Sequence, residues 1–139
     1  MKRYVLDTNL VVRFLTGDHP TMSAAAASLF EECAAGRVDL LLEPTIVAEA
    51  VFVLTGFYQR PRAEVADALR DLITGCRLRV PNQQVILNAL ERFKGTPVDF
   101  PDALVAAFAV QEGIPVASFD RDFDRFKDLR RFEPKPKQS

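Results

Sequence analysis

Short apolar runs alternate with longer segments of helical periodicity along the chain. The runs at residues 4–6, 40–42, 78–80 and 114–119 have the length and composition of buried parallel strands. Apolar positions at helical spacing fill the intervals, which predicts helices at 9–15, 21–35, 44–57, 61–75 and 83–93, a helix from Asp99 to a stop at Gly113, and a short helical segment near 122–126. This alternation predicts an α/β fold, a three-layer sandwich with a mostly parallel central sheet.

The chain length and the absence of repeats and linkers predict the domain organisation. A chain of 139 residues has the size of one ordinary domain, and neither an internal repeat nor a linker divides it. We expect a single domain over residues 1–132 and a flexible tail over 133–139, where two prolines and two lysines gather. The longest apolar run, residues 103–110, is too short to cross a bilayer, and the start lacks a signal-peptide pattern, so we expect a cytoplasmic protein with no membrane contact.

The residue types present restrict the chemistry that the chain can perform. Cys33 and Cys76 have no neighbouring cysteine or histidine at metal-binding spacing, and His19 is the only histidine. Acid–base or metal chemistry must therefore rest on carboxylates. The net charge of −1 is unusual for a nucleic-acid enzyme and gives no argument for one.

Two aspartates directly follow predicted strands. Asp7 comes after the first strand and Asp120 after the fourth. In open parallel α/β sheets, ligands bind beyond the carboxyl ends of the strands, so both side chains are candidates for a site there. The alternative is that each carboxylate caps the helix or turn that follows it.

Glu49 shares a helical face with apolar side chains at Ile46, Val53 and Phe57. An ionised glutamate buried in such a stripe costs several kcal/mol unless a cation or a hydrogen-bond donor compensates it. A position at the edge of the stripe, exposed to water or paired with an arginine, is the alternative.

Asp102 stands at the front of residues 103–110, which are apolar on every helical face. Such a pattern predicts a central, buried helix whose first turn opens inside the protein. The alternative is helix capping, with Asp99 as the cap and Asp102 in the first turn, where the helix dipole favours a negative charge.

Converging carboxylates would raise one another's pKa and weaken the fold. Oxygen-binding divalent cations such as Mg²⁺ or Mn²⁺ relieve this repulsion, and they support hydrolysis of phosphodiesters without histidine or cysteine. The four acids Asp7, Glu49, Asp102 and Asp120 therefore predict a metal site with hydrolytic chemistry.

Four pieces of the chain, in order, resemble those of the PIN-domain nucleases, and most closely the VapC-type toxins of toxin–antitoxin pairs. They are the segments 4–9 (YVLDTN), 45–49 (TIVAE), 99–106 (DFPDALVA) and 118–123 (SFDRDF). The resemblance implies that Asp7, Glu49, Asp102 and Asp120 are the catalytic acids that hold the metal. By the same positions, Thr8, Asn9 and Ser118 orient ligands or water, Asp122 assists the metal and Asp99 caps a helix.

The resemblance also implies an activity and partners. The activity is cleavage of single-stranded or loop RNA by a Mg²⁺-dependent endoribonuclease, with Mn²⁺ as a possible substitute, leaving 5′-phosphate and 3′-hydroxyl ends. The partners are a second copy of the chain in a homodimer and a small antitoxin protein that covers the acidic groove.

Two other functions are compatible with parts of the pattern. A haloacid-dehalogenase-like phosphatase also begins with a strand and an aspartate, but it needs a second acid at the position of Asn9. A PIN-like module that binds RNA or protein without catalysis would lack one of the acids, and all four are present.

Overall fold

The computed structural model describes residues 1–137, and the chain separates into two compact units. The first unit covers Met1–Gln83, and the second begins at Gln84. Each unit is described by itself below.

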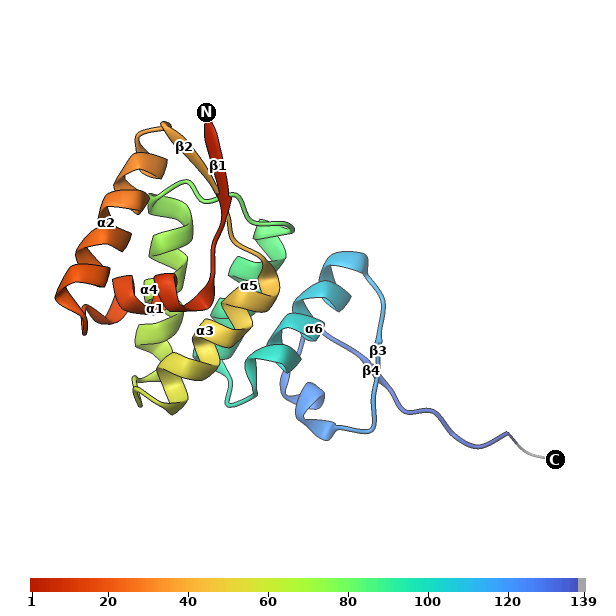
Figure 1. Cartoon of the computed structure of the whole chain (residues 1–139). Helices are drawn as coiled ribbons and strands as arrows, with labels where there is room; N and C mark the ends of the chain where they lie inside the picture. The colour runs from red at the N-terminus through yellow and green to blue at the C-terminus, as the bar shows by residue number, and fades with distance from the viewer. Residues whose placement is uncertain (138–139) are drawn as a thin grey trace. The chain divides into compact units, whose positions relative to one another are not determined.

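The first unit is built on two parallel strands and four helices (Figure 1). In β1 and β2, Lys2 lies opposite Val38 and Val5 opposite Leu41, and Arg79 adds a parallel bridge to Leu41. In chain order the elements are β1 (Lys2–Val5), α1 (Thr8–Thr16), α2 (Pro20–Ala34), β2 (Val38–Leu41), α3 (Pro44–Gly56) and α4 (Arg62–Gly75).

Helix α1 packs against both α2 and α3, which brings the end of β1 close to α3. Val11 of α1, Leu40 of β2 and Val47 of α3 are fully buried in this core. The helix ends at Gly17, whose φ of 64° is left-handed and therefore suits a residue without a Cβ. The packing holds the first residues of α1 beside α3, where the predicted acids Asp7 and Glu49 stand.

The second unit contains the remaining helices and another pair of short parallel strands. Val116 of β3 lies opposite Arg131 of β4, and the rings of Phe93 and Phe100 pack edge to face with centroids 6.0 Å apart. Its elements are α5 (Gln83–Gly95), α6 (Phe100–Glu112), β3 (Val116–Ala117), the 3₁₀ helix η1 (Arg121–Arg125) and β4 (Arg131–Phe132).

The predicted α/β class, with parallel strands and six α-helices, is confirmed. The strand expected at 78–80 is a single bridge at Arg79, and the strand expected at 114–119 is reduced to Val116–Ala117. Strand β4 was not predicted, because a two-residue strand carries no periodicity. The single domain over 1–132 remains a prediction. So does the tail: residues 133–137 form no helix or strand, and 138–139 lie outside the described residues.

The sequence predicted that helix α6 is buried on every side, and this prediction is wrong. Its small side chains, including Ala103, Ala106 and Ala107, are buried, whereas Val105 and Val110 are exposed. Alanines allow close packing along one face, and the larger valines point away from it. Among residues 1–137, no helix has the length and apolar character needed to cross a membrane.

Candidate metal-binding site

Four of the predicted side chains line one pocket of the first unit. Asp7, Thr8, Asn9 and Glu49 are among the residues that line a cavity of about 370 Å³, here called the Asp7 pocket. Leu6 continues the pairing of β1 by donating its N–H to the carbonyl of Leu41 at 2.9 Å, so Asp7 stands directly beyond the strand. The structure thus brings the first and second predicted acids, Asp7 and Glu49, to the same cavity.

Asp7 occupies the N-cap position of α1 with extended backbone (φ −99°, ψ 156°), but its side chain makes no capping hydrogen bond. An N-cap aspartate normally accepts a hydrogen bond from a backbone N–H of the first turn. The capping alternative therefore does not account for this carboxylate, which remains available to a ligand in the pocket.

Thr8 is the single buried polar side chain within residues 1–137, at 6% exposure, and its hydroxyl has no hydrogen-bond partner there. Leaving a buried hydroxyl unsatisfied costs about 1–3 kcal/mol. Because Thr8 lines the Asp7 pocket, a water or ligand oxygen in the pocket would supply the missing partner.

The prediction that Glu49 lies within a buried apolar face of its helix is wrong. The buried face of α3 consists of Val47, Ala50, Val51 and Leu54, and Glu49 lies outside it, exposed to solvent. Phe57, predicted to share the stripe, is 83% exposed. The apolar residues of α3 surround the helix almost evenly, so spacing alone could not identify the face that packs inward.

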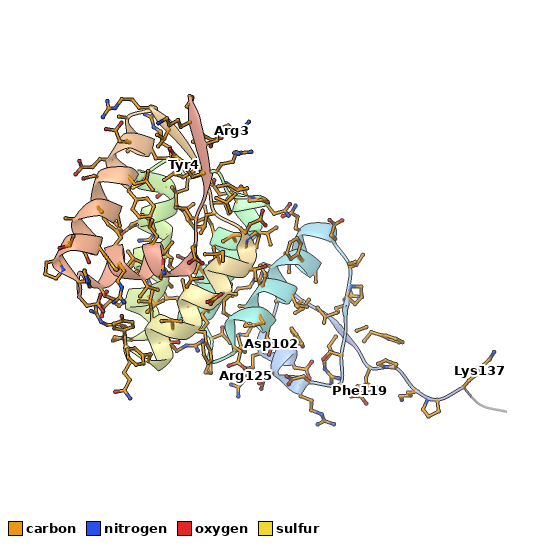
Figure 2. All side chains as sticks on the ribbon, in the orientation of Figure 1. Arg3, Tyr4, Asp102, Phe119, Arg125 and Lys137 are labelled. Carbon is orange, nitrogen blue, oxygen red and sulfur yellow. The ribbon has the colours of Figure 1, made fainter. Side chains whose placement is uncertain are left out.

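Asp102 lies half-buried in the first turn of α6, where Figure 2 labels it. Burial raises the pKa of this carboxyl, and the negative charges of Asp120, Asp99 and Asp122 raise it further. Asp102 is therefore subject to the negative charges of three other acids of the second unit. A bound cation would relieve the repulsion on Asp102.

Asp120 is held by short backbone contacts after β3. Its N–H donates to the hydroxyl of Ser118 at 2.9 Å, and its carboxylate accepts the N–H of Asp122 at 2.8 Å. Asp120 thus caps η1 through one of its carboxylate oxygens, which is the alternative that the sequence left open. Ser118 positions the backbone of this acid.

Asp99 stands at the N-cap of α6, but its side chain makes no capping hydrogen bond. The prediction that this side chain caps the helix is therefore wrong, although its position before the helix is correct. Pro101 in the first turn lacks an N–H, which removes one of the donors that a cap would satisfy.

The donor set suits an oxygen-binding divalent cation. Carboxylates, hydroxyls and an amide are ligands of Mg²⁺ and Mn²⁺, and the negative charges around Asp102 favour a positively charged ligand. Among residues 1–137, no group of three or more histidine, cysteine or acidic side chains is arranged to hold a metal.

One polar network beside the Asp7 pocket was not predicted. Asp18 accepts hydrogen bonds from the Tyr58 hydroxyl at 2.6 Å, from Arg13 Nη1 at 2.9 Å and from the Thr16 hydroxyl at 2.9 Å. The contacts with Tyr58 and Arg13 lower the pKa of Asp18 to about 2. Tyr58 and Asp18 are 40 residues apart, so no local pattern could have indicated this contact.

The chain matches a family model for the PIN domain over residues 4–129. It therefore belongs to the PIN-domain family, whose members are mostly metal-dependent nucleases. The matched residues include all four predicted acids. A search of curated proteins found no match to the chain.

Proposed function

We propose that this protein is a metal-dependent endoribonuclease in which Asp7, Glu49, Asp102 and Asp120 together hold a divalent cation, Mg²⁺ or its substitute Mn²⁺. The observation that carries the proposal is the unsatisfied, buried hydroxyl of Thr8 in a pocket shared with the free carboxylate of Asp7 and with Glu49. The pKa of Asp102, raised by burial and then by the charges of Asp120, Asp99 and Asp122, supports a cation at the second pair of acids as well.

The residues of the chain have distinct tasks in this proposal. Asp7 and Glu49 supply oxygen ligands in the Asp7 pocket. The Thr8 hydroxyl donates a hydrogen bond to a water or a phosphate oxygen there. Ser118 holds the backbone of Asp120, and Asp122 fixes the Asp120 side chain by donating its N–H. Asn9, exposed at the start of α1, presents its amide to the same pocket.

A bound divalent cation would lower the pKa of an attacking water and neutralise charge on a phosphodiester. This chemistry requires only oxygen ligands. It is therefore compatible with a chain whose single histidine, His19, caps α2 by accepting the N–H of Met22 at 3.1 Å.

A cleavage assay tests the proposal. The protein should cut single-stranded RNA with Mg²⁺ and lose this activity in EDTA, and Glu49→Gln should lower the rate roughly 100-fold or more because it removes a charged ligand. Glu43→Gln is the matched control: Glu43 is an exposed acid before α3 and does not line the pocket, so its removal should leave the rate unchanged. RNA that binds but is never cut would favour the non-catalytic module instead.

We further propose that the protein acts in the cytoplasm as the toxin of a toxin–antitoxin pair, as a homodimer with a small antitoxin. Both partners rest on the resemblance to VapC-type toxins. Expression of the chain alone should then arrest growth, and Asp120→Asn should relieve the arrest because it removes an acid of the proposed site. Plate counts after induction, with Glu43→Gln as a variant that keeps the arrest, measure this. Equal arrest by the wild type and by Asp120→Asn would refute the toxin role.

A further inference from the structure

The lining of the Asp7 pocket includes residues that the proposed hydrolysis does not use. They are Val12, Arg13, Val53, Phe57 and Tyr58. The whole cavity of about 370 Å³ falls within the range of roughly 300–1,000 Å³ that is usual for small-ligand pockets. Carboxylates and aromatic rings therefore belong to one cavity.

Phe57 is highly exposed and contacts a neighbouring aromatic ring. Its side chain is 83% exposed, and its ring packs edge to face on Tyr58 with centroids 5.0 Å apart and an interplanar angle of 78°. The Tyr58 hydroxyl is in turn anchored to Asp18 at 2.6 Å. An exposed aromatic ring that contacts an anchored tyrosine thus lines the pocket.

Arg13 is anchored to the same carboxylate. Its Nη1 donates to Asp18 Oδ2 at 2.9 Å, and the Thr16 hydroxyl donates to Oδ1 at 2.9 Å. One acid therefore positions a positive charge and, through Tyr58, an aromatic ring. Groups fixed in advance lose little conformational freedom when a ligand binds.

We propose that Phe57 is a stacking platform for one unpaired base of the RNA substrate, with Arg13 supplying positive charge toward the adjoining backbone phosphate. The inference rests on the proposed nuclease function and names a determinant of its substrate class. Bases stack on aromatic rings with little regard to sequence, and a base within a duplex has no free face to offer. The platform thus selects single-stranded RNA.

The alternative occupant of this pocket is a peptide, and its chemistry fits less well. An apolar peptide segment could cover the aromatic side chains of the pocket, but it would offer no negative charge to Arg13. A nucleotide offers a flat apolar face and a negative charge together.

Binding of two matched probes tests the platform. One is a short labelled oligo(A), and the other is a ribose–phosphate chain of the same length without bases. Both are bound to Glu49→Gln protein, in which cleavage is suppressed, and affinity is read by fluorescence anisotropy. The base-containing probe should bind roughly 5- to 150-fold more tightly. Phe57→Ala should bring this ratio close to one, and Phe57→Tyr should retain it.

Phe52→Ala is the matched control, because Phe52 is another exposed phenylalanine of α3, at 77% exposure, and does not line the pocket. It should leave the ratio unchanged. The inference is overturned if Phe57→Ala leaves the ratio unchanged, or if Phe52→Ala lowers it equally, since either result places the base elsewhere.

Cleavage by proteins that retain Glu49 is measured separately. RNA cleavage with no dependence on Phe57 in either assay refutes the platform and leaves the nuclease. A base preference that needs Phe57 in a protein that cuts no RNA refutes the nuclease and leaves a base-binding pocket.

Discussion

At the scale of single residues, Asp102 shows the conflict between stability and the proposed chemistry most clearly. Its pKa is raised by burial first and then by Asp120, Asp99 and Asp122. A carboxyl whose pKa is higher in the folded state stabilises the fold only while it is protonated. This contribution is present below the unfolded-state pKa and is lost as pH rises through the folded-state pKa. At neutral pH without metal, Asp102 therefore weakens the fold.

Asp102→Asn should accordingly raise the melting temperature at pH 7 in EDTA, by roughly 1–3 °C for a domain of this size. The gain should be smaller at about pH 4, because the wild-type carboxyl is protonated to a greater extent there than at pH 7. Thermal unfolding followed by circular dichroism at both pH values measures the effect.

Asp124→Asn provides the opposite control for Asp102→Asn. The hydrogen bond with Arg131 lowers the pKa of Asp124, so removal of this charge should lower the melting temperature at pH 7. If Asp102→Asn destabilised the protein as Asp124→Asn does, the repulsion inferred for Asp102 would be absent.

At the scale of elements, the helices were predictable because their boundary signals are local. Gly17 and Gly113 end α1 and α6 in left-handed conformation, and prolines open α2 and α3. The strands were predictable only in part. Arg79 forms a single bridge, and β4 is two residues long, so each depends on a partner that is distant in sequence.

The Asp18 network joins the end of α1 to the segment after α3. The Tyr58 and Arg13 hydrogen bonds lower the pKa of Asp18 from 3.8 to about 2. A lowered carboxyl pKa gives stability that is present above the unfolded-state value and is lost as pH falls through the folded-state value. Asp18→Asn should therefore destabilise the protein at pH 7, and its difference from the wild type should close as the pH falls from about 4 to about 2.

Urea unfolding across this pH range measures the effect of Asp18→Asn. Asp71→Asn is a suitable control, because Asp71 is 71% exposed and pairs only with the adjacent Arg70 among the described ion pairs. A difference between Asp18→Asn and the wild type that persisted unchanged at about pH 2 would mean that the carboxylate charge is not what joins the two elements.

At the scale of the whole molecule, the sequence predicted which strands two of the acids follow, but not the surroundings of the acids. Asp7 and Asp120 follow β1 and β3 as the strand pattern predicted. The surroundings of Glu49 were misjudged, because an evenly apolar helix does not reveal which face is buried. The Tyr58–Asp18 contact could not be predicted, since it depends on how α1 and α3 pack.

The central proposal is that Asp7 and Asp102 both serve the proposed metal-dependent cleavage. Single-turnover cleavage of RNA by Asp7→Asn, by Asp102→Asn and by the double variant tests it most directly. Each single change should lower the rate at least about 100-fold. The double variant should be no slower than the slower single variant, because the loss of one residue already removes the contribution of residues that act as a unit. Losses that multiply, to about 10,000-fold or more, would show two independent contributions, and an undiminished rate in either single variant would remove that acid from the site.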